Sequence, residues 1–244
     1  MLVHAKKPFV RGCLLMASFL ALFVLLLTPL FSDNEGKGRL TGLQYADGVF
    51  NELSKGSSYF IPAVRAQVDG LRDTTAEFSV NLKKAELAPL ALKLVQTSGA
   101  GEASVEGGKV SFKGNLGILL ASAVDDSDNL YHNQAEPVSR KYDGEPALKV
   151  ATAWWQMLVP AVKELQKQGR IAEAQVVDQV IRRAVEPGNN FYSVPASRVA
   201  DHIWLMAGML IFYVIYTLWY GFAIFELFEG LGLAMTKSTS KQES

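Results

Sequence analysis

The densest group of side chains able to do chemistry lies in one acidic stretch near the middle of the chain. Asp125 and Asp128 supply carboxylates, and His132 follows Asp128 at a spacing of four residues. Calcium prefers several oxygen ligands, and zinc accepts histidine together with carboxylates. Asp125, Asp128 and His132 are therefore the candidate ligands for an irregular calcium or zinc site.

A regular calcium loop does not fit this stretch. Numbered from Asp125, the sixth position is Leu130, where an EF-hand needs glycine for its sharp turn, although Glu136 stands at the twelfth. The simpler interpretation, which we favour, is the solvated acidic end of a helix over 115–128 that is capped by Asn115. The sequence therefore predicts neither a metal nor a cofactor.

Nucleophilic catalysis has little support in the sequence. Of the three histidines, only His132 lies well inside residues 33–202, the segment between two long uncharged runs. Neither a G-x-S-x-G elbow nor an H-E-x-x-H helix occurs in the sequence. Adjacent tryptophans, Trp154 and Trp155, point about 100° apart on a helix, so one can be buried while the other faces a pocket. Core packing is nevertheless the role that we expect for both.

Composition excludes several functional classes. The 244 residues carry 24 Lys+Arg and 24 Asp+Glu, and this zero net charge argues against a nucleic-acid-binding protein. Cys13 is the single cysteine, which excludes an intrachain disulfide, iron–sulfur clusters and cysteine-based zinc sites. The absence of disulfides and of N-x-[ST] sequons favours a bacterial periplasm over a eukaryotic cell surface.

Two long uncharged runs predict membrane-spanning helices. Gly12 to Ser32 and Ile203 to Phe225 contain no charged residue, and the first would form a helix about 31 Å long, close to the thickness of a bilayer core. A cleaved signal peptide is the competing interpretation of the first run. We favour an uncleaved anchor because the run is longer than a usual signal core and ends without a small-residue cleavage site.

The distribution of basic residues predicts the orientation. Lys6, Lys7 and Arg11 precede the first run with no acidic residue among them, which places the N-terminus in the cytoplasm. The predicted organisation is a cytoplasmic N-terminus (1–12), a first span (13–32), a periplasmic domain (33–202), a second span (203–225) and a cytoplasmic tail (226–244).

The segment between the spans reads as mainly α-helical. Apolar residues recur at helical spacing in most of it, whereas 103–113 alternates apolar and polar residues around Gly107-Gly108, as in a β-hairpin. We expect the last helix of the segment to stop at Pro187-Gly188. The predicted fold class is mainly α: two transmembrane helices that flank an extracytoplasmic helical bundle with one small hairpin.

The second span carries a less common pattern. Tyr213, Tyr216 and Tyr220 line one helix face near the middle of the bilayer, where a phenol is costly without a partner. A second seam of mostly small residues repeats every seven positions and includes Ala207 and Gly221. Both features predict that this helix contacts another spanning helix, either the first span, a partner subunit or a second copy.

These patterns favour a non-enzymatic accessory or scaffolding subunit of a membrane complex, in contact with the lipid bilayer and other membrane proteins. An extracytoplasmic ligand-binding or sensory module that acts through a partner is the alternative, since the predicted cytoplasmic segments are too short for a signalling domain. A membrane-anchored enzyme is the third interpretation.

Overall fold

The structure of the chain is a computed structural model that describes residues 3–32 and 38–233. It is mainly helical, as the sequence predicts. The chain divides into two compact units: the terminal unit comprises Met1–Phe50 and Arg198–Ser244, and the central unit comprises Asn51–Ser197.

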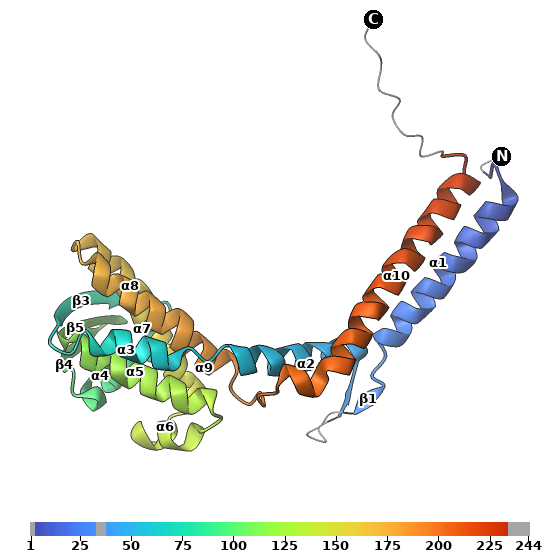
Figure 1. The fold of residues 1–244 in the computed structure, drawn as a ribbon. Coiled ribbons are helices and arrows are strands. Elements are labelled where there is room, and N and C mark those ends of the chain that lie inside the picture. The colour runs from blue at the N-terminus through green and yellow to red at the C-terminus, as the bar shows by residue number, and fades with distance from the viewer. Residues whose placement is uncertain (1–2, 33–37, 234–244) are drawn as a thin grey trace, which may run out of the picture. The chain divides into compact units, whose positions relative to one another are not determined.

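Two long apolar helices, α1 (Lys6–Leu26) and α10 (Ile203–Gly230), dominate the terminal unit and lie side by side (Figure 1). A 3₁₀ turn, Val199–His202, leads into α10. Both helices are long and apolar enough to cross a membrane, and in each only 6% of the most apolar stretch is buried within the protein.

The boundaries of these helices differ from the predicted spans. α1 begins at Lys6, where Pro8 fits the first helical turn because its missing N–H has no partner there in any helix. It ends at Leu26, so residues 27–32 are not helical, in keeping with the bias that Pro29 imposes against helix at Thr28. α10 begins where the second run begins but continues past Phe225.

Short elements follow α1 in the terminal unit. β1 (Phe31–Ser32) pairs with β2 (Arg39–Leu40) in antiparallel fashion. The helix α2 (Gly42–Ser57) then starts with a capping box, in which the Thr41 hydroxyl accepts from the Gln44 amide at 3.2 Å and Gln44 Oε1 accepts from the Thr41 amide at 2.9 Å. α2 begins in the terminal unit, and its last residues belong to the central unit.

The central unit packs helices against a small three-stranded sheet (Figure 1). Its strands are β3 (Thr75–Asn81), β4 (Gly101–Glu106) and β5 (Lys109–Asn115). Its helices are α3 (Ile61–Asp69), a 3₁₀ turn (Ala85–Leu87), α4 (Ala88–Ser98), α5 (Leu116–Tyr131), α6 (Ala135–Lys141), α7 (Ala147–Lys167), α8 (Ile171–Val180), a π-helical turn (Ile181–Val185) and α9 (Glu186–Asn190).

The predicted hairpin is present as β4 and β5, joined at Gly107-Gly108, whose φ angles of 54° and 88° suit the tight turns that connect such strands. The prediction of a lone hairpin is incomplete, because β3 pairs with β5 along the sheet order β3-β5-β4, with Phe78 opposite Phe112. One face of β3, which includes Phe78, is buried.

The core of the central unit lies between the sheet and the helices. Trp154 on α7, Tyr142 and Phe112 are among its largest buried side chains. The predicted cap of α5 is present, since Asn115 Oδ1 accepts from the amide of Ile118 at 2.9 Å. This hydrogen bond fixes the start of the helix that carries the acidic cluster.

The predicted helix stop at Pro187-Gly188 is wrong. A π-helical turn precedes Pro187, and the Glu186 amide bonds to the carbonyl of Ile181. Pro187 then lies in the first turn of α9, where no N–H is needed. Gly188 lies tight against α5, because a Cβ there would be 2.7 Å from the carbonyl oxygen of Ser127. The glycine therefore permits close helix packing and does not end the helix.

Candidate functional site

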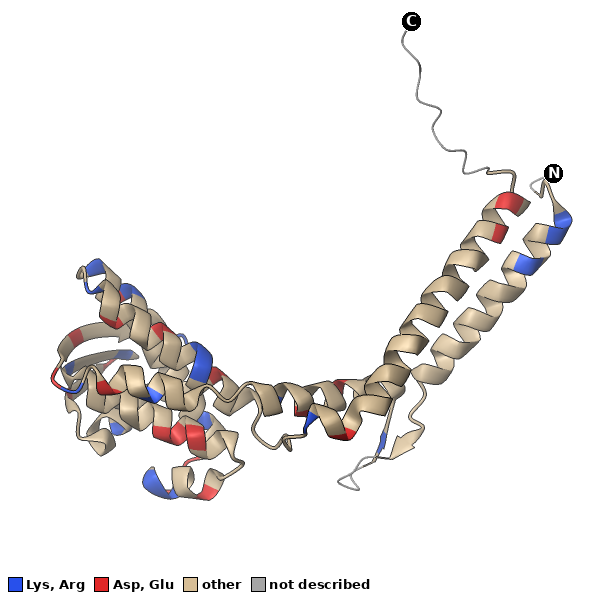
Figure 2. Ribbon diagram, in the orientation of Figure 1, with Lys and Arg blue, Asp and Glu red and all other residues tan. Residues whose placement is uncertain are grey.

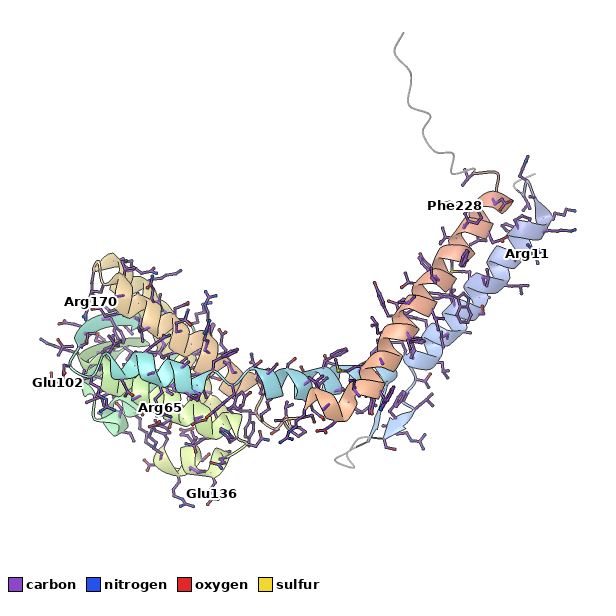
Figure 3. The ribbon with its side chains drawn as sticks, viewed as in Figure 1. Arg11, Arg65, Glu102, Glu136, Arg170 and Phe228 are labelled. Atoms are coloured by element: carbon purple, nitrogen blue, oxygen red, sulfur yellow. The ribbon has the colours of Figure 1, made fainter. Side chains whose placement is uncertain are left out.

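The three predicted metal candidates lie together at the C-terminal end of α5. Arg65 on α3, labelled in Figure 3, pairs with Asp125, and its second terminal nitrogen lies 3.7 Å from Asp128 Oδ2. His132 Nδ1 lies 3.1 Å from Asp128 Oδ1, and the Tyr59 hydroxyl donates to the same oxygen at 3.0 Å. The carboxylates are thus engaged by donors from neighbouring elements.

This arrangement is a poor cation site. A guanidinium between two carboxylates supplies the positive charge that a metal would bring, and it repels a second cation. Within residues 3–32 and 38–233, no group of three or more His, Cys, Asp or Glu side chains is placed to hold a metal ion. The cluster instead ties α5 to α3.

The sequence analysis expects a solvated acidic end for this helix, but the acidic end of α5 is only partly solvated. The Asp125 side chain is 53% exposed, but that of Asp126 is 3% exposed. Asp126 Oδ2 accepts from the Tyr142 hydroxyl at 2.6 Å and from Trp154 Nε1 at 2.8 Å, and Oδ1 accepts from Lys141 Nζ at 2.8 Å. This buried carboxylate therefore joins α5 to α7 and to the end of α6.

Tyr142 is held in its neutral form by this network. Burial, and then the adjacent Asp126 carboxylate, raise the pKa of the Tyr142 hydroxyl above its ordinary value. The neutral hydroxyl can donate to Asp126 at any pH at which proteins normally work. The Asp126 cluster thus has the chemistry of a structural anchor, with its carboxylate oxygens occupied by donors.

A second buried charge, on Lys55, joins the first and last segments of the central unit. Lys55, near the end of α2, is 3% exposed, and its ammonium donates to Asn133 Oδ1 at 3.1 Å and to the carbonyls of Phe191 and Val194 at 2.9 and 2.5 Å. Asn133 also accepts from the Ser193 amide at 2.8 Å. We call Lys55 and Asn133, with the segment 191–194 that they hold, the base clamp.

Neutral groups satisfy all three donors of Lys55. The ammonium also lies 5.3 Å from the centre of the Tyr131 ring, a cation–π contact, and the Tyr131 hydroxyl donates to the Lys55 carbonyl. Burial lowers the pKa of Lys55. The sequence offers no signal for this role, because the partners of Lys55 lie 76 or more positions away along the chain.

The two adjacent tryptophans have different environments. Trp154 is fully buried, whereas Trp155 is partly buried and borders a cavity of about 300 Å³ between α7 and α9. Trp155 Nε1 donates to Glu186 Oε1 at 3.1 Å. The expectation of core packing therefore holds for Trp154, and the pocket alternative describes Trp155 better.

The helix pair of the terminal unit is joined along a regular seam. The seam residues of α10 recur at alternating spacings of four and three, and they are Phe212, Tyr216, Trp219, Ala223, Glu226 and Gly230. Such spacing is typical of left-handed helix packing. Trp219 Nε1 donates to the Leu15 carbonyl on α1 at 3.1 Å, and the Tyr216 ring lies 6.4 Å from Phe19.

Glycines let the two helices approach closely at one end. A Cβ on Gly12 would lie 2.6 Å from the backbone nitrogen of Leu227, and one on Gly230 would lie 2.6 Å from the Cα of Phe9. The Gly230 carbonyl also accepts from the amides of His4 and Ala5 at 2.8 and 3.0 Å. Backbone contacts of this kind require residues without side chains.

The tyrosines and the small-residue seam predicted from the sequence lie on different sides of α10. Tyr216 and Tyr220 contact Phe19 of α1, and Tyr213 packs edge-on against Tyr216. Apart from its own stretch of helix, no described atom lies within 4 Å of the position that a Cβ on Gly221 would take. At about 100° per residue, Ala207 and Gly221 lie on the face of α10 opposite to α1. The predicted role of that face in binding another helix stays a prediction.

Sequence reasoning missed several residues that hold the structure together: Lys55, Asp126, Glu186, Gly12 and Gly230. Comparison of the chain with protein-family models, with curated proteins and with solved structures found no match.

Proposed function

We propose that the chain is a two-pass membrane protein of a bacterial inner membrane, with both termini in the cytoplasm and residues 33–202 in the periplasm. In this proposal it serves as a non-enzymatic accessory or scaffolding subunit of a membrane complex. The observation that carries the proposal is the pairing of α1 and α10, which buries a narrow seam and leaves most of their apolar surface exposed. Such a surface is costly in water and favourable in lipid.

The charges of the helix pair fit a membrane hairpin. Figure 2 shows long uncharged stretches on α1 and α10, with charged residues gathered at one end of the pair. At that end are the three basic residues of α1 and the two acidic residues of α10, namely Lys6, Lys7, Arg11, Glu226 and Glu229. Figure 3 places Arg11 and Phe228 at this same end. An excess of lysine and arginine beside a span favours the cytoplasmic side.

In this proposal the role of the protein is binding and not catalysis. The candidate metal ligands Asp125 and Asp128 both lie beside Arg65, and the neighbouring Asp126 accepts hydrogen bonds in a buried network. The face of α10 that carries Gly221 remains open to a neighbouring helix. Small residues on an open helix face allow a second spanning helix to approach closely.

The first test concerns topology. Paired reporters that are active on only one side of the membrane, fused after Ser32 and after Ser244, should report the periplasm and the cytoplasm respectively, because the basic residues before α1 keep the N-terminus inside. The same side for both fusions contradicts the two-pass proposal. A mature protein that starts near Asp33 also contradicts it.

The second test concerns the partner. Full-length tagged protein, purified in mild detergent, is expected to retain a reproducible set of membrane proteins. Gly221→Leu combined with Tyr213→Phe should reduce their recovery several-fold, because leucine blocks close approach on the open face. Gly208→Leu is the matched control, since a Cβ at Gly208 also meets nothing within 4 Å but lies about 140° away around the helix. Equal losses from both variants, or from neither, contradict docking through the Gly221 face.

A further inference from the structure

The cavity beside Trp155 has the construction of a small-ligand site. Its volume of about 300 Å³ is at the lower end of the range of ligand pockets, and it is bordered by apolar Val185 and by the polar side chains of Thr152, Glu186, Asn189 and Asn190. A small organic molecule therefore fits it.

A π-helical turn borders this cavity through Val185. The wider turn at Ile181–Val185 replaces the ordinary helical hydrogen-bonding pattern, and π turns of this kind are frequent at functional sites. Gly188 is held against the backbone of α5 on one side of α9. Glu186 and the two asparagines then border the cavity toward α7. The unusual turn and the polar lining thus occur at the same place.

The charged side chain at this site is Glu186, and among the described residues it forms no ion pair within 4.0 Å. Among the described residues that border the cavity, Glu186 is the one with an ionisable side chain. Its Oε1 accepts from Trp155 Nε1, and within the described part of the chain Oε2 has no hydrogen-bond donor. The arginines of the π turn have other contacts: Arg182 donates to Asp178 at 3.0 Å, and Arg183 lies 5.3 Å from the centre of the Phe60 ring.

We infer that this cavity binds a small organic cation, such as a quaternary or primary ammonium compound. The indole ring of Trp155 offers an aromatic surface that attracts cations, and Glu186 supplies the opposite charge beside it. The carboxamides of Asn189 and Asn190 add hydrogen-bonding groups at the rim. This inference does not depend on the proposed role as an accessory subunit.

Choline, added to the full-length protein in detergent, is the first probe of this site. Calorimetry and tryptophan fluorescence should show saturable binding, and Trp155→Phe should remove the fluorescence response. The neutral isostere 3,3-dimethylbutan-1-ol has the same shape without the charge, so it should bind at least about tenfold more weakly. This comparison uses the unaltered protein and does not depend on the folding of any variant.

A matched pair of variants tests the role of the carboxylate. Glu186→Gln keeps the shape and the acceptor for Trp155 but removes the charge, and it should weaken choline binding at least about tenfold. Glu136→Gln removes an exposed carboxylate on α6 and should leave binding unchanged. The inference is overturned if choline shows no saturable binding, if the neutral isostere or a neutral sugar binds as well as choline, or if folded Glu186→Gln binds choline normally.

Discussion

Replacing Asp126 with alanine is expected to lower the free energy of unfolding by about 3–5 kcal/mol, the usual cost of removing one partner from a buried ionic cluster. The change leaves the Tyr142 hydroxyl, the Trp154 indole N–H and the Lys141 ammonium without their shared acceptor. Tyr142 and Trp154 are fully buried, so water cannot replace the carboxylate without opening the core. Urea denaturation of the full-length protein, followed by near-ultraviolet circular dichroism of its aromatic residues, measures the effect.

Asp125→Ala is the matched control, one residue along the same helix. Its side chain is about half exposed and pairs with Arg65, so its loss should cost less than about 1 kcal/mol. Asp126→Asn should fall between the two, because the amide keeps one acceptor for the ring donors but offers Lys141 no charge. A cost for Asp126→Ala no larger than that for Asp125→Ala would show that the cluster does not stabilise the fold.

Replacing Gly12 with leucine is expected to force α1 and α10 apart. The new Cβ would lie 2.6 Å from the backbone nitrogen of Leu227, and backbone atoms cannot yield as a flexible side chain can. Interaxial distances between packed helices are about 8–10 Å, depending on the side chains between them, so a separation increase of about 2 Å is expected. Pulsed electron paramagnetic resonance between spin labels on exposed Cys13 and on Phe225→Cys can measure this increase.

Gly221→Leu is the control on the opposite face of α10, where an added Cβ meets no described atom outside its own stretch of helix within 4 Å. It should leave the distance between the two labels unchanged. An unchanged distance in the Gly12→Leu protein would mean that the glycine contact does not set the spacing of the pair. The two variants also separate contacts within this chain from contacts with a partner, since Gly221→Leu should affect only the latter.

Hydropathy and periodicity were sufficient to predict the two apolar helices, the mainly helical class and the β4–β5 hairpin, because each depends on a pattern local in sequence. The prediction that the helix ends at Pro187-Gly188 was wrong because each of these residue types is found in two structural contexts. Proline ends a helix or fits its first turn, and glycine ends a helix or permits close packing. For Gly188, only the position of α5 against it shows that the glycine permits close packing and does not end the helix.

The candidate sites were harder to predict than the elements, since their partners are distant in sequence. Asp125, Asp126 and Asp128 look alike in a list of residues, yet only Asp126 faces the core, where Trp154 meets it from α7. The cavity beside Trp155 adjoins a π turn, which no pattern in the sequence predicts. Its spacing shifts Glu186 relative to an ordinary helix, so a count of helical turns places that side chain wrongly.

The base clamp has a mechanical consequence for the central unit. The first and last residues of the central unit are joined by hydrogen bonds. The Ser197 amide donates to the Glu52 carbonyl at 3.3 Å, and the Lys55 ammonium donates to the carbonyls of Phe191 and Val194. A force that pulls on the two ends of this unit therefore loads these few polar bonds before it reaches the apolar core. Tension along the chain is therefore expected to break these polar hydrogen bonds before it separates the buried side chains of the core.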